Sequence, residues 1–254
     1  MKPDYKNWMP LGMVMGCALA CCLAFIFAII FGFSTILGMI IFIVSILLLV
    51  VTIWMYMMYR AFSYDGKRQM SRHIVEGVAE YITIPDGGIG LDVGCGSGAL
   101  TIACAKRNSN AKMIGVDRWG KEYASFSKEL CENNSYAEGV KNTSFQRGDA
   151  VKLEFPDEHF DAVTSNYVYH NIPSRDRQAI LLETLRTLKK GGTFAIHDIM
   201  SRSRYGDMNF FVNKLKDMGY DHVEIIDTTN GKFMSKWESI WMELSGSKIL
   251  VGRK

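Results

Sequence analysis

The sequence predicts an α/β domain with a mostly parallel sheet, preceded by a pair of apolar helices. Three observations lead to this prediction. From about residue 85 to the end, short apolar segments typical of strands alternate with amphipathic segments typical of helices. A glycine-rich loop, "GCGSG" at residues 94–98, follows the first of these strands. In contrast, no charged residue occurs between Lys6 and Arg60.

The uncharged N-terminal run is about twice the roughly 20 apolar residues that one membrane-spanning helix needs. Its length favours two spans, at about 10–33 and 36–59, with a break at "GFST" (32–35). A secretory signal peptide would have a shorter apolar core and a small-residue cleavage site. We therefore expect residues 1–60 to form a transmembrane helical hairpin. One span followed by a buried or re-entrant helix remains an alternative.

The residues that flank this run predict its orientation. Basic residues precede the first span and follow the second: Lys2, Lys6, Arg60, Lys67, Arg68 and Arg72. Aromatic residues lie at the expected membrane interfaces: Trp8, Trp54, Tyr56 and Tyr59. The positive-inside rule places both ends in the cytoplasm, which requires an even number of spans. Charge and length therefore agree on a two-span membrane protein with both termini and the folded domain cytoplasmic.

The six cysteines do not indicate a metal site. Three lie in the first predicted span and three in the following domain: Cys17, Cys21, Cys22, Cys95, Cys104 and Cys131. None forms a Cys-x-x-Cys pair with a matching second pair, which is the usual pattern of zinc ligands. We expect free cytosolic thiols and no bound metal.

The rest of the chain is divided into a connecting segment and a ligand-binding domain. Residues 61–84 are expected to form an amphipathic connecting helix, and residues 85–254 the domain. Strands are predicted at 89–93, 112–117, 143–150, 160–168, 191–199, 222–228 and 248–252. Helices are predicted at 99–107, 120–134, 174–190 (with Ser174 as N-cap) and 206–219. Only the loop 229–247 joins the last two strands, which allows the final strand to be antiparallel.

The glycine loop predicts a bound nucleoside. In doubly wound sheets, ligands bind at the carboxyl ends of the strands, beside the first strand. Gly94, Gly96 and Ala99 fit the G-x-G-x-x-G/A pattern, and Asp117 fits the ribose-binding acid about twenty residues further on. This pattern does not separate nicotinamide cofactors from other nucleosides. Asp92 would repel a pyrophosphate but suits an ammonium or sulfonium group, and Asp149 could accept a hydrogen bond from an adenine amino group.

With these features in place, residues 65–254 resemble the class I S-adenosylmethionine-dependent methyltransferases. The resemblance is carried by "LDVGCGSG" (91–98), "GVD" (115–117), "GDA" (148–150), "FDAVTSNYVYHNI" (160–172) and "LKKGGTFAIHDI" (188–199). It implies a Rossmann-like sheet of seven strands in the order 3-2-1-4-5-7-6, with strand seven antiparallel. A proline often precedes the glycines of "KKGG" in that family and is missing here, which affects only a turn.

The resemblance implies S-adenosyl-L-methionine as cofactor and a role for each matching residue. Its methionine part would face Asp92, Gly94, Cys95, Gly96 and Gly98, and its ribose hydroxyls would bind Asp117. Its adenine would lie along Trp119 or Arg118 and bond Asp149 and the backbone of Ala150. Asn166 and Tyr167 would border the transferable methyl group. Structural alternatives are a helix-capping Asp92, a turn-forming Asp149, a core-packing Trp119 and a Cys95 that only fills the loop.

The implied reaction is an in-line displacement at an activated methyl carbon, which depends mainly on alignment and exclusion of water. A general base is needed only if the acceptor must lose a proton. His170 is the predicted base, with Tyr167 and Asn166 completing the catalytic set, and a surface histidine is the alternative. Other polar groups expected near the methyl are Asn171, His197 and Asp198. Tyr64, Asp65 and His73 are candidates to cover the cofactor.

The predicted acceptor is a small, apolar or amphiphilic molecule such as a lipid, a quinone-like phenol or a thiol. A membrane tether meets such molecules at high local concentration, and the apolar loop 229–247 either lines their entrance or covers the sheet edge. The formal net charge of +3 is mild, no basic face interleaved with aromatics occurs, and no nucleic-acid partner is expected. An NAD(P)-dependent oxidoreductase and a non-catalytic S-adenosylmethionine-binding membrane module remain alternative functions.

Overall fold

The computed structural model of the chain describes residues 2–120 and 125–254. The chain divides into two compact units, which are described separately. One unit consists of Lys6–Ser71. The other combines the residues up to Tyr5 with Arg72–Lys254, so the chain leaves this unit near its start and returns to it later.

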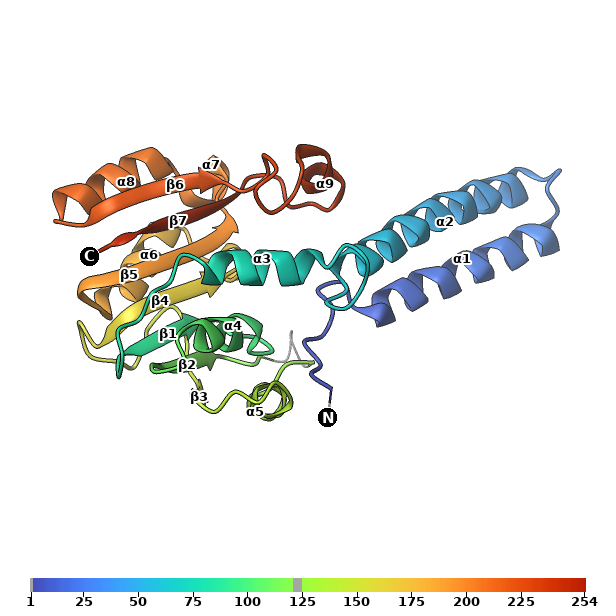
Figure 1. Cartoon of the computed structure of the whole chain (residues 1–254). Helices are drawn as coiled ribbons and strands as arrows, with labels where there is room; N and C mark the ends of the chain where they lie inside the picture. Colours follow the sequence, from blue (N-terminus) through green and yellow to red (C-terminus); the bar gives the residue numbers. More distant parts are fainter. Residues whose placement is uncertain (1, 121–124) are drawn as a thin grey trace. The chain divides into compact units, whose positions relative to one another are not determined.

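The first unit is a pair of long apolar helices, α1 (Leu11–Phe31) and α2 (Ile36–Phe62) (Figure 1). Gly32 ends α1 with a φ of 77°, and the Thr35 hydroxyl caps α2 by accepting a hydrogen bond from the Gly38 N–H. Both helices are long and apolar enough to cross a membrane. The helix ends agree closely with the predicted segments 10–33 and 36–59, although α2 continues for three residues more.

In the second unit, the described residues form a seven-stranded sheet in the order β3-β2-β1-β4-β5-β7-β6 (Figure 1). The strands are β1 (Ile89–Val93), β2 (Lys112–Asp117), β3 (Thr143–Arg147), β4 (Phe160–Asn166), β5 (Leu188–Ile199), β6 (Asp221–Asp227) and β7 (Ser247–Arg253). β1 to β5 pair in parallel, and β7 is antiparallel to both β5 and β6. The predicted strand order and the antiparallel final strand are confirmed.

Among the described residues, helices precede the first strand and lie between later strands, and four of them pack on the sheet. They are α3 (Met70–Ala79), α4 (Ala99–Arg107), α5 (Lys128–Ala137), α6 (Arg177–Arg186), α7 (Arg202–Tyr205), α8 (Met208–Asp217) and α9 (Lys236–Trp241), with a 3₁₀ turn, η2, at Tyr169–Asn171. α4 packs on β2, α5 on β3, α6 on β5 and α8 on β6. The short helix α9 lies inside the segment 229–247, which was expected to be a loop.

Other helix boundaries also differ from the sequence-based expectation. α3 is shorter than the predicted connecting helix over 61–84, because Gln69 has a φ of 49° just before α3 begins. α6 is capped by Asp176 rather than Ser174, since the Asp176 carboxylate accepts the Ala179 N–H at 3.0 Å. Residues 121–124 of the predicted helix 120–134 lie outside the described residues, and α5 begins after its N-cap, Ser127.

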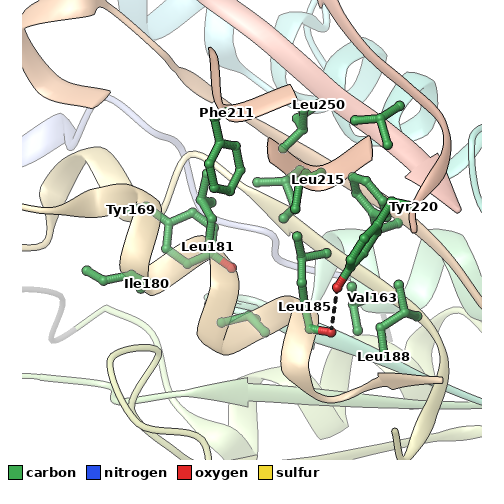
Figure 2. Close-up of a cluster of buried hydrophobic side chains, with 14 of the residues drawn as sticks. Val163, Tyr169, Ile180, Leu181, Leu185, Leu188, Phe211, Leu215, Tyr220 and Leu250 are labelled. Carbon is green, nitrogen blue, oxygen red and sulfur yellow. Dashed lines mark hydrogen bonds between the residues drawn. The ribbon is translucent and has the colours of Figure 1, made fainter. Parts of the chain in front are cut away.

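The main hydrophobic core lies between the sheet and helices α6 and α8. Leu181 and Leu185 of α6 and Phe211 and Leu215 of α8 are fully buried there, as Figure 2 shows. Leu91 and Val93 of β1 belong to the same core. Because successive side chains of a strand point to opposite faces, Asp92 between them is directed to the face that carries α4. This alternation places an acid beside the glycine loop.

Candidate active site at the carboxyl ends of the parallel strands

The glycine loop turns sharply from β1 into α4. Gly94, Gly96 and Gly98 all have positive φ angles, of 74°, 55° and 81°, a region that glycine adopts without steric cost. A Cβ at Gly94 would lie 2.3 Å from the Val168 side chain, and one at Gly98 would lie 3.1 Å from Phe145. At Gly96 the nearest described atom would be 3.9 Å away. Packing therefore requires the outer two glycines, whereas the middle one leaves room beside the backbone.

Asp117, at the end of β2, holds the middle of this loop. Its carboxylate accepts the Gly96 N–H at 2.9 Å and the Trp119 N–H at 2.7 Å. The Trp119 indole N–H in turn donates to the Gly96 carbonyl at 3.0 Å. The Cys131 thiol of α5 donates to the same carbonyl at 3.2 Å, a contact that the sequence did not predict. Asp117, Trp119 and the loop thus form one hydrogen-bonded unit that lies at the expected ligand-binding edge.

Asp92 lies deeper than the sequence suggested. Its side chain is buried, and its two oxygens accept hydrogen bonds from the hydroxyls of Thr101 (2.7 Å) and Thr164 (2.9 Å). Burial disfavours the charged form of Asp92 and raises its pKa to about 7. The two hydrogen bonds lower the pKa and offset only part of this effect. The carboxylate is therefore behind the loop rather than at its mouth. A direct bond from Asp92 to a ligand's ammonium group stays a prediction.

The raised pKa of Asp92 predicts a pH-dependent contribution to stability. Protonation of this group favours the folded state, so its contribution is complete below the unfolded pKa of 3.8 and is lost as the pH rises towards 7. We expect the melting temperature of the wild type relative to Asp92→Asn to fall between pH 4 and pH 7 and to level off above. Thermal unfolding of both proteins across this range measures the difference. A difference that does not change with pH would contradict the assignment.

The other predicted cofactor residues are placed as follows. Asp149 is exposed and accepts the Val151 N–H at 2.9 Å in a tight turn. Ala150 packs against the main core. Cys95 is buried in the glycine loop, and burial raises the pKa of its thiol. Arg118 is exposed, and its neighbour Trp119 is half-buried. The structure brings all of these to the same edge of the sheet, and their contacts with adenine or methionine stay predictions.

Asn166 and Tyr167, after β4, are tied into neighbouring strands. The Asn166 amide oxygen lies 2.8 Å from His197 Nδ1, and His197 Nε2 lies 2.9 Å from the Thr228 hydroxyl. Burial lowers the pKa of His197 to about 3, so this ring is neutral and structural. The Tyr167 hydroxyl lies 2.7 Å from the Ser247 hydroxyl, and burial raises the pKa of this tyrosine above its usual value.

His170 forms a pair with Asp198 that links the end of β4 to the end of β5. His170 Nδ1 lies 2.5 Å from the Asp198 carboxylate, which is fully buried and also accepts the His170 and Ile199 backbone N–H groups. With Nδ1 held in this way, Nε2 is the ring nitrogen that can accept a proton. The sequence named Asp198 only as a nearby polar group, because its pairing joins residues 28 positions apart.

The segment 229–247 buries part of its apolar side chains. Phe233, Met234 and Met242 are buried, and the Phe233 ring lies 5.2 Å from the His197 ring. Trp237 on α9 is 71% exposed. Of the candidates to cover the cofactor, His73 belongs to the same compact unit as the sheet, whereas Tyr64 and Asp65 belong to the helical unit.

Comparison with known proteins agrees with this geometry. Residues 91–196 match a family model described as a methyltransferase domain. A 2-phytyl-1,4-naphtoquinone methyltransferase from Synechococcus elongatus is 38% identical over 110 residues, which are 43% of this chain and 45% of that protein. A demethylmenaquinone methyltransferase from Lactobacillus johnsonii is 29% identical over 164 residues, which are 61% and 65% of the two chains. A sterol 24-C-methyltransferase from Gibberella zeae is 31% identical over 133 residues, or 52% and 33%. The first of these matches thus spans less than half of the relative's length.

Solved structures share the fold at low sequence identity. Geranyl diphosphate C-methyltransferase from Streptomyces coelicolor, in complex with Mg²⁺, geranyl diphosphate and S-adenosylhomocysteine, gives a TM-score of 0.57 at 13% identity and covers 77% of this chain and 83% of that one. A methyltransferase from Aquifex aeolicus, described as S-adenosylmethionine-dependent, gives 0.50 at 18% identity, with coverage of 74% and 93%. The [4+2]-cyclase SpnF gives 0.56 at 18% identity, with coverage of 74% and 82%.

The cyclase shows that this fold alone does not establish methyl transfer, since one fold hosts several activities. The match of the family model is the more specific finding. Residues 91–196 thus match a methyltransferase domain, and the sheet has the fold of a solved S-adenosylmethionine-dependent methyltransferase.

Proposed function

We propose that the chain binds S-adenosylmethionine beside β1 and β2 and transfers its methyl group to a small lipophilic acceptor. The observation that carries this proposal is the glycine loop held open at Gly96 by Asp117. The match to a methyltransferase domain and relatives named for quinone and sterol methylation support it. An NAD(P)-dependent oxidoreductase is disfavoured because the family model and the named relatives are methyltransferases.

The residues around the loop fit a cationic nucleoside. Asp117 has two carboxylate oxygens with remaining acceptor capacity for the ribose hydroxyls. Gly96 lets the ligand approach the backbone closely. A positive group near the loop would favour ionised Asp92 and offset the desolvation that raises its pKa. When bound, the cofactor supplies a methyl group activated by a sulfonium.

The chain's own contribution to the chemistry would centre on His170. Its Nε2 would take the proton of a hydroxyl or thiol acceptor while the acceptor attacks the methyl carbon. Asp198 would hold the ring in place through Nδ1 and stabilise the imidazolium that forms. Asn166 and Tyr167 would shape the wall between His170 and the cofactor, since their side chains are anchored to His197 and Ser247.

We further propose that α1 and α2 anchor the enzyme in a membrane. Only 11% of the most apolar window of each helix is buried, whereas the core helix of a soluble protein is mostly buried. The residues up to Tyr5 and those from Arg72 onward belong to one compact unit, which supports a topology with both ends of the hairpin on the same side of the bilayer. Together with the flanking basic residues, this supports a cytoplasmic site that meets acceptors dissolved in the membrane.

Topology can be tested with one introduced cysteine at a time and a membrane-impermeant maleimide on intact cells. Ser34 lies in the turn between α1 and α2, and Ser203 is exposed in the sheet-containing unit. We expect Ser34→Cys to be labelled from outside and Ser203→Cys only after permeabilisation, with the unsubstituted chain as background. Labelling of both cysteines from outside, or of neither before permeabilisation, would argue against a two-span hairpin with a cytoplasmic domain.

The function itself is tested with the full chain in detergent or lipid nanodiscs. We expect calorimetry to show binding of S-adenosylmethionine and S-adenosylhomocysteine but not of NAD. Labelled cofactor with a membrane lipid extract is then expected to give a labelled product that partitions into organic solvent. Binding of NAD alone would favour an oxidoreductase, and cofactor binding without transfer to any acceptor would favour a non-catalytic module.

A further inference from the structure

Asn134 on α5 connects two segments that are far apart in the sequence. Its side chain is buried, with 2% exposed. The amide oxygen accepts the Asp4 backbone N–H at 2.7 Å, and the amide nitrogen donates to the Asp4 carbonyl at 3.0 Å. The same nitrogen donates to the Ser97 carbonyl in the glycine loop at 2.9 Å. One side chain thus holds both the segment before α1 and the loop that would receive the cofactor.

A second contact fixes the same segment. The Tyr5 side chain is 6% exposed, and its hydroxyl donates to the Glu138 carboxylate at 3.0 Å. The other oxygen of Glu138 pairs with the Lys106 ammonium of α4 at 2.5 Å. Residues 4 and 5 are therefore bonded to α5, which itself contacts α4 and the glycine loop. Residues 4 and 5 are therefore docked in place rather than loosely attached, because the buried side chains of Asn134 and Tyr5 both form their hydrogen bonds across this contact.

We infer that the short segment before the first apolar helix, Lys2–Tyr5, is a positioning element of the cofactor site and acts through Asn134. This rests on the proposed S-adenosylmethionine site. With Asp4 in place, both amide hydrogens and the amide oxygen of Asn134 form hydrogen bonds. These bonds fix the orientation of the side chain, which in turn restrains the Ser97 carbonyl. Without Asp4, the buried amide loses two of its three partners, which costs free energy and releases the loop.

The inference has a reciprocal consequence. If docking of Lys2–Tyr5 tightens the cofactor loop, cofactor binding must stabilise the docked segment by the same free energy. A purely structural role for Asn134 predicts no such response of the N-terminal segment to ligand.

Hydrogen exchange on the full-length protein tests this link, with S-adenosylhomocysteine as the probe. We expect the ligand to slow exchange both in the peptide that contains Asp4 and in the peptide that contains residues 94–98. Asn134→Asp keeps an acceptor for the Asp4 N–H but removes both donated bonds. It is expected to weaken S-adenosylhomocysteine binding about tenfold and to abolish the ligand-induced protection at Asp4.

The matched control is Asn133→Asp, the same change at an exposed position of α5. It is expected to leave affinity and protection as in the wild type. Tyr5→Phe is a milder variant that removes only the bond to Glu138 and is expected to weaken binding by a few-fold, which keeps the test open if Asn134→Asp does not fold. Wild-type affinity in both Asn134→Asp and Tyr5→Phe, or an Asp4 peptide that does not respond to ligand, would overturn the inference.

The same experiments distinguish a failure of the proposed function from a failure of the inference about Asn134. If the wild type binds no S-adenosylhomocysteine, the assignment of the site is wrong. The connection through Asn134 is then judged without ligand, by comparing exchange in wild type and Asn134→Asp. Faster exchange in both peptides of the variant would support the connection, and faster exchange in only one would refute it.

Discussion

Asp117→Asn is expected to weaken binding of S-adenosylmethionine and S-adenosylhomocysteine by about 100-fold or more. The carboxylate accepts two backbone N–H groups, from Gly96 and Trp119, and is the predicted partner of the ribose hydroxyls. An amide at this position has one acceptor oxygen and places a donor against one of those N–H groups, so the loop loses a charge-assisted hydrogen bond. A hydrogen bond to a charged group contributes about 1.5–3 kcal/mol, and two or more are affected here.

Calorimetry of the full-length variant with both ligands measures this effect. The matched control is Asp86→Asn, the same chemical change at an exposed turn before β1, at the opposite end of that strand from the glycine loop. It is expected to bind both ligands as the wild type does. Equal affinities for wild type and Asp117→Asn would remove the basis for placing a nucleoside at this edge of the sheet.

His170→Ala is expected to lower the rate of methyl transfer by about 10²–10⁴-fold, the usual contribution of a positioned general base. Cofactor affinity should change little, because His170 contacts Asp198 rather than the glycine loop. Asp198→Asn should also slow transfer, since the imidazolium would lose the buried carboxylate that stabilises it. The expected signature of both variants is therefore a fall in kcat with an unchanged Kd for S-adenosylhomocysteine.

Transfer of labelled methyl groups to an identified acceptor measures kcat, and calorimetry measures the Kd. His222→Asn, at an exposed position on β6, serves as the control histidine substitution and is expected to retain full activity. An unchanged kcat in His170→Ala would mean that the acceptor loses its proton without help from the protein. The acceptor would then be a group that ionises readily or one that carries no proton.

The glycine loop contacts the segment that follows β4 and carries His170. The residue after Tyr167, Val168, packs against Gly94, so the glycine loop and the segment that carries His170 are in direct contact. A larger residue at Gly94 would push these two segments apart. The glycine loop and the candidate base are thereby held close together, an arrangement that the proposed in-line displacement would require.

The sequence alone determined the order of elements and the place of the ligand-binding loop. Apolar strands such as 89–93 and 112–117 are local patterns, and the glycines at 94, 96 and 98 signal a sharp turn wherever they occur. The segment 229–247 was expected to be a loop and contains the short helix α9, but the prediction that the final strand can be antiparallel was correct. The two apolar helices were predicted almost to the residue, because a long uncharged run has a signal that does not depend on partners.

Only the tertiary structure decided which side chains meet. Asp92 turned out to lie behind the loop because Thr101 and Thr164, from two other elements, enclose it. Asp198 pairs with His170, and Asn134 bonds Asp4 across 130 positions of sequence. Local patterns report which face of an element is buried, but they carry no record of the partner on that face. Hydrogen bonds between distant residues depend on how strands are ordered and helices packed, and for that reason they became visible only in the folded chain.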